Sequence, residues 1–265
     1  MGKLLDYRKP PVVEVAIGVQ FAPIASLTVP YIGLFWEKIR EDFVRAEEQG
    51  TLPHIVGPVS TEPQFTMTST PELPRTWFLS EKGDRIIQIQ RDRFHYNWRK
   101  LAPEDQYPRY PIVKNAFFDY WTRFCRFLER EKLPPPVIDQ CELVYVNHIT
   151  KGEAWNTAAD LPGIFSIFRW APRHSFLQEP ESLRWSMRFP LPGENGWLHF
   201  DGFPAKVLPT GPEVIRFPLT ARGCPNGNID DQALAKWFDV ARESIVRGFA
   251  DLTTDQTDTL WERLS

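Results

Sequence analysis

The sequence lacks the features that mark membrane-spanning, secreted and disulfide-framed proteins. It contains no run of about 18 or more apolar residues, and its first residues, MGKLLDYRKPPVVE, have no apolar core of signal-peptide length. Its three cysteines, Cys125, Cys141 and Cys224, show no paired spacing, and their odd number argues against a disulfide framework. We therefore expect a cytoplasmic protein that is not embedded in a membrane.

Excess basic charge and catalytic motifs are lacking too. With 31 Lys and Arg residues against 34 Asp and Glu, the net charge is −3, so the chain has no broad basic field for nucleic acid. It contains no Gly-x-Ser-x-Gly, no phosphate-cradling glycine-rich loop, no dinucleotide fingerprint and no histidine pair at metal-ligand spacing. We expect no metal and no cofactor, and binding more than catalysis. The candidate general bases are His95, His148, His174 and His199, and the candidate carboxylates are Glu14 and Glu142.

Aromatic residues and prolines, by contrast, are abundant. Aromatic residues make up 14% of the chain and include ten tryptophans, whose large rings bury much area in a core or an interface. The chain also has 25 prolines. Because proline cannot donate a hydrogen bond to a central strand, we expect many strands to end sharply or to lie at sheet edges.

The apolar periodicity of the first half predicts strands and two helices. Val15, Ile17, Val19 and Phe21 alternate with smaller or polar residues, as in a strand with one buried face. Apolar residues at helical spacing predict helices over 30–48 and 112–132, the second with the stripe Phe117, Trp121, Phe124 and Leu128. Further strands are predicted at 54–60, at 75–80 and within 84–100.

The second half repeats this order of elements. Residues 142–149 align with residues 14–21 without a gap, and each segment has a glutamate at its start. Strands predicted at 183–189, 196–203 and 214–221 precede a long helix over 230–251 and a short closing helix within 255–264. We therefore predict an α+β fold of two pseudo-equivalent repeats, 1–136 and 137–265, which together form one compact unit. Each repeat is an antiparallel curved sheet with a long helix across one face, similar in outline to the TATA-binding-protein-like arrangement.

The densest mixture of apolar and hydrogen-bonding side chains lies in residues 84–100, DRIIQIQRDRFHYNWRK. Ile87 and Ile89 have one strand parity, whereas Phe94, Tyr96 and Trp98 have the other, so a bulge or tight turn near 91–93 is predicted to bring both sets to one face. The second repeat lacks these glutamines and the Asn-Trp pair. The residues that the first half alone carries are therefore the predicted binding residues: Gln88, Gln90, Arg91, Arg93, Asn97, Trp98 and Arg99.

Three interpretations of this segment stay open. Its amides and guanidinium groups suit a polar groove that binds a peptide, a nucleotide or a partner's backbone. They also suit an exposed sheet face with internal pairing to Asp92, Glu14 or Glu142, and the two glutamates are expected to form equivalent structural ion pairs with arginine. Thirdly, the arginines and rings suit a clamp on single-stranded nucleic acid, which the net charge makes the least favoured interpretation.

Several motifs resemble a sporadically distributed bacterial family of uncharacterised proteins of about this length. They are Pro10-Pro-x-x-Glu14, the block Gln-x-Gln-Arg-Asp-Arg-Phe-x-x-Asn-Trp-Arg-Lys over 88–100, Tyr107-Pro-x-Tyr110, Tyr145-x-Asn147, Ile245-Val-x-x-Phe249 and Trp261. The resemblance spans nearly the whole chain and brings no catalytic residues with it. The family's patchy occurrence implies horizontal transfer, as is common for phage-defence and toxin–antitoxin genes.

Two functional hypotheses follow. The first is a non-enzymatic binding or adaptor protein that engages a protein partner, such as a neighbouring gene product in a bacterial defence or toxin–antitoxin module. Tryptophan, tyrosine and arginine dominate interface hot spots, which favours this hypothesis. The second is a small-ligand-binding protein or enzyme with a pocket between sheet and long helix, near Trp121, Phe124 and Trp237. The sequence does not determine the oligomeric state.

Overall fold

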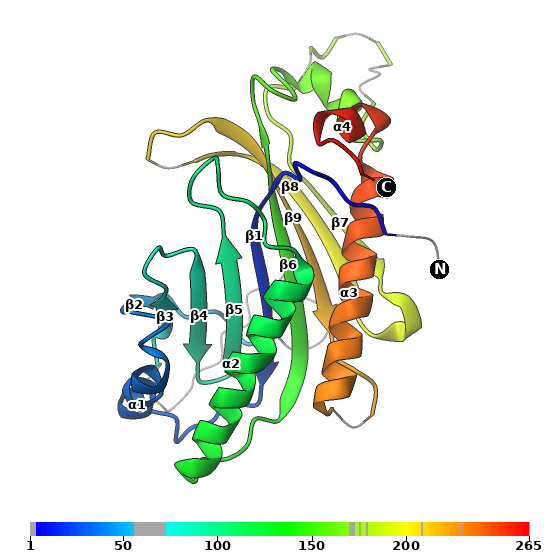
Figure 1. Cartoon of the computed structure of the whole chain (residues 1–265). Helices are drawn as coiled ribbons and strands as arrows, with labels where there is room; N and C mark the ends of the chain where they lie inside the picture. The colour runs from blue at the N-terminus through cyan, green and yellow to red at the C-terminus, as the bar shows by residue number, and fades with distance from the viewer. Residues whose placement is uncertain are drawn as a thin grey trace. The chain divides into compact units, whose positions relative to one another are not determined.

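A computed structural model describes residues 4–55, 73–169, 173–174, 176–178, 180–207, 209–227 and 229–264. The fold is α+β, with a large antiparallel sheet and a few helices (Figure 1). The elements are β1 (Val12–Phe21), α1 (Val29–Ile39), β2 (Arg45–Gln49), β3 (Arg75–Leu79), β4 (Arg85–Gln90), β5 (Arg93–Arg99), α2 (Tyr110–Arg130), β6 (Ile138–Thr150), η1 (Ala158–Gly163), β7 (Trp185–Pro190), η2 (Pro192–Glu194), β8 (Trp197–Lys206), β9 (Glu213–Gly223), α3 (Asp231–Leu252) and α4 (Asp255–Leu260).

The strands are hydrogen-bonded in the order β2-β3-β4-β5-β1-β6-β9-β8-β7. The chain divides into two compact units: unit 1 comprises Met1–Val13, Val144–Ala221 and Phe238–Ser265, and unit 2 comprises Glu14–Leu143 and Arg222–Trp237. The predicted repeats, 1–136 and 137–265, stay a prediction.

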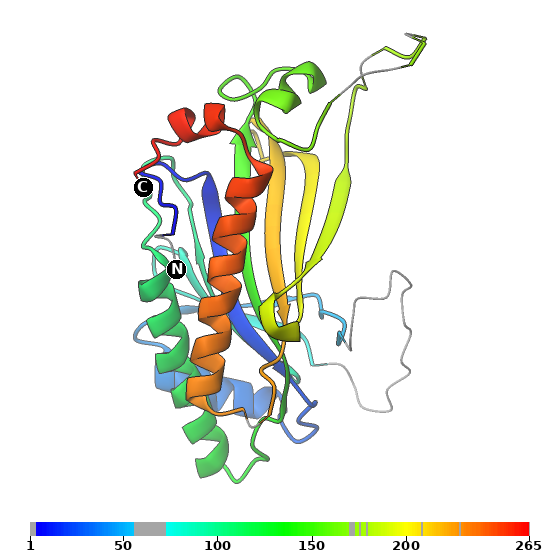
Figure 2. The ribbon, with the colours of Figure 1, turned by 90° about the vertical axis from the view of Figure 1, so that its right-hand side faces the viewer.

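In unit 2, the two helices pack on the apolar face of the strands. β1 and β4 both pair antiparallel with β5, and Val19 and Ile89 lie opposite Phe94. Phe94 contacts Phe124 of α2 with ring centroids 5.1 Å apart and Phe35 of α1 at 6.4 Å. Both figures show α2 on one side of these strands (Figures 1 and 2). The predicted apolar stripe of α2 therefore forms the core of this unit.

The helix predicted over 30–48 is shorter than expected. α1 ends at Ile39, and β2 follows at Arg45–Gln49, where it pairs antiparallel with β3. All but the last residue of β2 are exposed, so the segment carries little apolar periodicity of its own. Backbone pairing with β3 overrides the helical tendency of its alanine and glutamates. The strand predicted at 54–60 lies outside the described residues except for His54 and Ile55, which are not in a strand.

Unit 1 is built around β7, β8, β9 and most of α3. Phe217 of β9 contacts Phe249 of α3 and Phe165, with centroids 6.2 and 5.0 Å apart, and Figure 2 shows α3 alongside these strands. The predicted start of α3 is confirmed, because Asp230 Oδ1 accepts a hydrogen bond from Ala233 N at 2.8 Å. In the part of the chain that the structure describes, no helix is long and apolar enough to cross a membrane.

Candidate functional site

The predicted binding segment is a hairpin with a two-residue turn. β4 ends at Gln90, β5 begins at Arg93, and these two residues lie opposite one another across the strand pair. The tight turn predicted near 91–93 is therefore confirmed. It places Ile89 opposite Phe94, so both apolar sets of the hairpin lie on the face toward the helices.

The other face of β1, β4 and β5 is polar, and we refer to it as the polar face. Residues that lie directly opposite one another on paired strands point to the same face of the sheet. Arg93 lies opposite Gln90 of β4 and opposite Gln20 of β1, so these three side chains share the polar face. Among the predicted residues it includes Gln88, Gln90, Arg93, Asn97 and Arg99. Except for Arg99, these side chains are buried, with exposed fractions of 2–7%.

Two glutamines of the polar face hold a segment of the chain by its backbone. We refer to residues 51–55 as the strap. Gln90 accepts a hydrogen bond from Leu52 N and donates one to Leu52 O, each at 2.9 Å. Gln20 accepts from Ile55 N at 2.8 Å and donates to Ile55 O at 2.7 Å. Each glutamine therefore satisfies both backbone groups of one strap residue.

Arg93 ties the strap to the same face. Its Nη2 donates to Gln20 Oε1 at 2.7 Å and also to the carbonyl oxygen of Pro53. Burial lowers the pKa of Arg93, whereas the nearby Asp92 and Glu142 carboxylates act against this shift. Arg93 Nε is buried without a hydrogen-bond partner, and lies 3.8 Å from Asp92 Oδ1. The guanidinium is thus an internal cross-link, and is only 5% exposed.

The strap's histidine lies between two carboxylates. His54 Nδ1 is 2.7 Å from Asp92 Oδ2, and His54 Nε2 is 3.0 Å from Asp139 Oδ2. Gln20 Nε2 also donates to Asp139 Oδ1 at 2.9 Å, and Gln90 Nε2 donates to Asp92 Oδ1 at the same distance. Both ring nitrogens of His54 are therefore engaged, and the glutamines that hold the strap also orient the carboxylates.

A second chain of hydrogen bonds runs across the polar face. Gln88 Oε1 accepts from Arg75 Nη1 at 3.0 Å and from Trp77 Nε1 at 2.9 Å. Gln88 Nε2 donates to Asn97 Oδ1 at 2.7 Å, and Asn97 Nδ2 donates to Glu14 Oε1 at 2.6 Å. Buried amides are costly unless paired, and here each amide has partners on both of its polar atoms.

His95 lies between these two networks, over a glycine. It is opposite Gly18 in the register, and a Cβ added to Gly18 would lie 1.6 Å from His95 Cδ2 and 2.6 Å from the Phe94 carbonyl oxygen. Burial lowers the pKa of His95 to about 4, with Glu142 opposing the shift and Arg93 adding to it. His95 is therefore neutral at pH 7.

The glutamates at corresponding places in the two predicted repeats have different partners. Glu142 forms an ion pair with Arg222, as expected. Burial alone would raise the pKa of Glu142, but the charge of Arg222 and its hydrogen bond hold it below its usual value. Glu14 instead binds the amide of Asn97. The two glutamates are thus not equivalent in their hydrogen bonding.

The remaining predicted residues lie apart from the strap. Arg91 is in the turn, where its Nε donates to Leu27 O at 3.3 Å. Arg99 Nε donates to Gly83 O at 2.8 Å, and its guanidinium lies 5.8 Å from the centre of the Trp77 ring. Trp98 points to the face opposite the polar face, is 5% exposed and packs on Tyr107. A binding role for the seven predicted residues stays a prediction.

Sequence reasoning missed Gln20, His54 and Asp139 as members of this cluster. Gln20 is one of the residues that alternate with the apolar ones in the first predicted strand, and this position could have been used to predict it on the polar face. His54 and Asp139 gave no such signal, because they lie 85 positions apart in the sequence. Only folding brings them to the same polar face.

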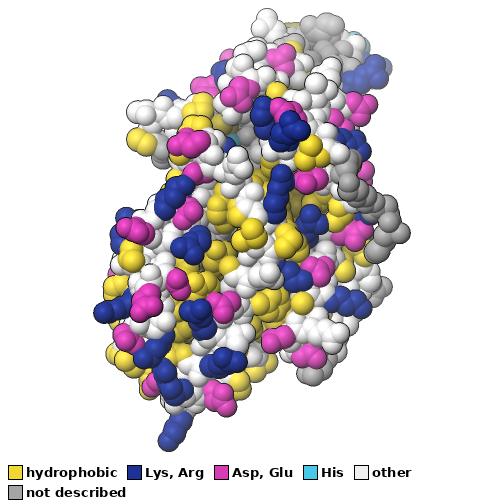
Figure 3. All heavy atoms as spheres, in the orientation of Figure 1, with side chains coloured by type: hydrophobic (Ala, Val, Ile, Leu, Met, Phe, Trp, Pro, Cys, Tyr) yellow, Lys and Arg dark blue, Asp and Glu magenta, His cyan; other side chains and the backbone are white. Residues whose placement is uncertain are grey.

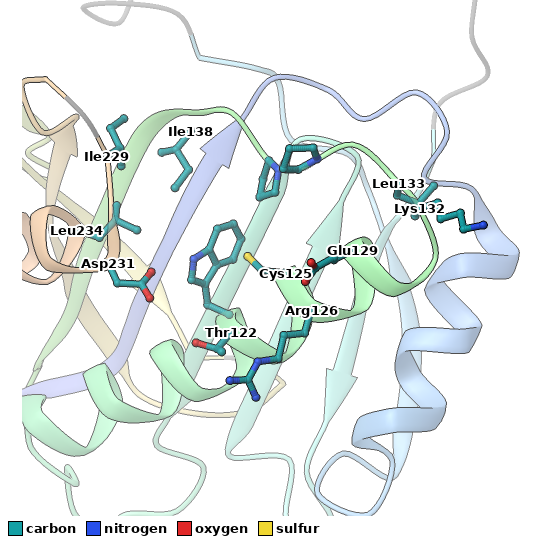
Figure 4. A pocket seen from close by; sticks show the side chains of 13 residues that line it. Thr122, Cys125, Arg126, Glu129, Lys132, Leu133, Ile138, Ile229, Asp231 and Leu234 are labelled. Atoms are coloured by element: carbon teal, nitrogen blue, oxygen red, sulfur yellow. The ribbon is translucent and has the colours of Figure 1, made fainter.

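A second candidate site is a cavity of about 690 Å³ in unit 2 (Figure 4). It lies between α2, the loop before β6 and the first residues of α3. Trp121, Cys125 and Leu234 line it together with charged side chains such as Arg126 and Asp231. Of the residues predicted for a pocket, Trp121 lines this cavity, whereas Phe124 is fully buried in the core. Burial, with a contribution from Asp231, raises the pKa of Cys125 to about 12.

Within the described ranges, no group of three or more His, Cys, Asp or Glu side chains is arranged to hold a metal ion. On the face seen in Figure 3, basic and acidic side chains are interspersed rather than gathered by sign. The chain matches no protein-family model and no curated protein.

Proposed function

We propose that the protein is a non-enzymatic binding protein whose polar face takes an extended stretch of a partner protein's backbone. The observation that carries the proposal is the pair of two-point contacts by which Gln90 holds Leu52 and Gln20 holds Ile55. A side-chain amide that meets both N–H and C=O of one residue binds backbone of any sequence, as strand addition does in other peptide-binding proteins. In the resting protein, the strap occupies this site.

The burial of the polar face decides how a partner would bind. Gln20, Gln90 and Arg93 are at most 7% exposed, so a partner cannot reach them while the strap is in place. The partner segment would therefore replace the strap instead of docking over it. The strap's own exposure supports this exchange, since Thr51 and Pro53 are exposed and Leu52, His54 and Ile55 are half-buried.

The chemistry of the cluster favours binding over catalysis. Both nitrogens of His54 are engaged by carboxylates, and His95 is enclosed and neutral. A general base needs a free lone pair within reach of a substrate proton. In this arrangement, the nitrogens of His54 are engaged and the lone pair of His95 is enclosed, so neither histidine can reach a substrate proton.

Peptide exchange tests the proposal. In a variant with residues 51–55 replaced by a glycine–serine spacer, a fluorescent peptide of residues 50–55 should bind saturably in an anisotropy titration. Wild type should bind it far more weakly, because its tethered strap competes at an effective concentration on the order of millimolar. Adding Gln90→Ala to the spacer variant should weaken binding about tenfold, because two hydrogen bonds to the peptide are lost, whereas adding Gln232→Ala, a change at an exposed helix position, should not.

The proposal fails if the spacer variant, shown to be folded by circular dichroism, does not bind the peptide or binds it equally well with Gln90→Ala. The cavity beside Trp121 supports a second candidate, a small-ligand-binding protein. A small molecule retained by the purified protein in native mass spectrometry, and lost in Trp121→Ala, would favour that candidate.

The internal duplication is part of the proposal too. Both halves of the chain follow the order strand, short helix, several strands and long helix, with α2 and α3 as the long helices, which supports two TATA-binding-protein-like repeats. On this proposal, the first repeat holds the partner segment and the second lacks the glutamines. A place in a defence or toxin–antitoxin module stays a prediction from the family resemblance.

A further inference from the structure

The strap contacts the polar face with one side chain as well as with its backbone. The ring of His54 lies between Asp92, in the turn after β4, and Asp139, in β6. We refer to Asp92 and Asp139 as the carboxylate pair. The Asp92 side chain is 6% exposed, the His54 ring 27% and the Asp139 side chain 40%. The carboxylate pair is therefore closed to solvent on the Asp92 side and open on the Asp139 side.

The hydrogen atoms available around the ring decide which protonation state fits the carboxylate pair. Gln20 Nε2 carries two hydrogens, and its two shorter contacts are with Ile55 O at 2.7 Å and Asp139 Oδ1 at 2.9 Å. It has no hydrogen left for His54 Nε2, which lies 3.2 Å away. A neutral ring has one N–H, so it would set a nitrogen lone pair against one of the two carboxylates. The pair therefore fits a ring that donates from both nitrogens, which is the imidazolium cation.

The charges that surround the ring favour a cation too. The charged groups that face it are Asp92, Asp139 and the guanidinium of Arg93, which donates to a neighbouring carbonyl of the strap. Glu142 and Arg222 pair with each other. Two carboxylates against one guanidinium leave one negative charge uncompensated. A cationic side chain between the carboxylates removes this excess, and a buried charge is costly without such a partner.

We propose that the carboxylate pair selects partner segments by a cationic side chain at the third of four residues. This inference rests on the proposed function, and the strap provides the register. The first and fourth partner residues take the places of Leu52 and Ile55, whose backbone groups the two glutamines hold. The third takes the place of His54, between the carboxylates. The backbone contacts accept any sequence, whereas the carboxylate pair favours protonated histidine, arginine or lysine.

A partner histidine makes this binding depend on pH. Imidazole changes its charge between about pH 5 and 8, and the carboxylate pair fits the charged form. Binding is strongest where the free ring already carries its proton. It weakens as the pH rises, because the proton must then be taken up from water. Arginine stays charged throughout, so a partner segment with arginine should bind without this dependence.

The test uses the spacer variant and fluorescent peptides of residues 50–55 that differ at one position. At pH 6, the native peptide should bind about tenfold more tightly than the His54→Gln peptide, whose neutral amide loses charge-assisted hydrogen bonds. From pH 6 to pH 8.5, the affinity of the native peptide should fall about tenfold, whereas the His54→Arg peptide should bind equally at both. Asp139→Asn in the spacer variant should remove most of the preference for histidine over glutamine. Glu153→Gln, a change at an exposed position of unit 1, should preserve it.

The peptide series separates this inference from the proposed function. If no peptide of the series binds the spacer variant, shown to be folded by circular dichroism, both are overturned. If the His54→Gln peptide binds as tightly as the native one, or if the preference survives in full in Asp139→Asn, this inference alone fails. A native-peptide affinity that stays constant from pH 6 to pH 8.5 also overturns it. An equal fall for the His54→Arg peptide does so too, because pH would then act on the protein and not on the bound side chain.

Discussion

The two faces of the sheet in unit 2 are both buried, but by different chemistry. On the face toward α2, Phe94 meets Phe124 and Phe35 in a cluster of rings. On the polar face, Gln90 and Gln20 hold the strap by its backbone. The apolar face gains stability from area removed from water, whereas the polar face mainly avoids the cost of unpaired groups. Burial alone therefore does not distinguish an apolar core from a network of paired polar groups.

The largest expected effect is on the apolar face. Phe94→Ala removes a fully buried ring and leaves a cavity that the neighbouring rings cannot fill, so it should lower the free energy of unfolding by about 3–5 kcal/mol in urea titrations. Phe176→Ala is the matched control, since Phe176 is 89% exposed, and should change it little. If Phe94→Ala lowered the free energy of unfolding by less than the polar-face variants do, the comparison between the two faces would fail.

The second effect is a pH dependence on the polar face. Burial lowers the pKa of His95 to about 4 from 6.5 in the unfolded chain. The unfolded state therefore binds the extra proton between pH 6.5 and 4, so stability is lost as pH falls through this window and the loss ends below pH 4. Its full size is about 3 kcal/mol. Urea titrations across this range should give a shallower pH slope for His95→Gln than for wild type.

Exposed His174 provides the control, because His174→Gln should leave the pH slope unchanged. His148, whose pKa is also lowered by burial and then by Arg216, contributes in the same direction in all these variants. An NMR titration of the His95 ring measures the same property without a mutation. A midpoint near 6.5 would show that His95 is not held neutral by its surroundings.

The smallest effect should come from the strap contact. Gln90→Ala leaves Leu52 N and O without their partner. Because the strap can turn these groups to water, the cost should be about 1–2 kcal/mol, below that of a fully buried group. Hydrogen exchange at Leu52 should accelerate, while exchange within β5 stays near that of wild type. If β5 amides accelerate equally, the strap is part of the core and not a displaceable segment.

The periodicity of the sequence was enough to predict most elements and the turn of the hairpin. The parity change between Ile89 and Phe94 predicted a bulge or a tight turn near Arg91, because either one places both residues on one face, and the structure shows the turn. Such signals lie within about ten residues of sequence and depend on local backbone geometry. The end of α1 and the presence of β2 were missed, because β2 is fixed by pairing with β3 and not by its own pattern.

The sequence by itself determined that Gln88, Gln90 and Asn97 would be polar side chains on a strand with an apolar back. Tertiary structure decided that they face the protein's own interior, where Gln90 holds the strap and Asn97 binds Glu14. The physical reason is the same in each case: strand register and loop path set contacts between distant segments, and no local pattern records either.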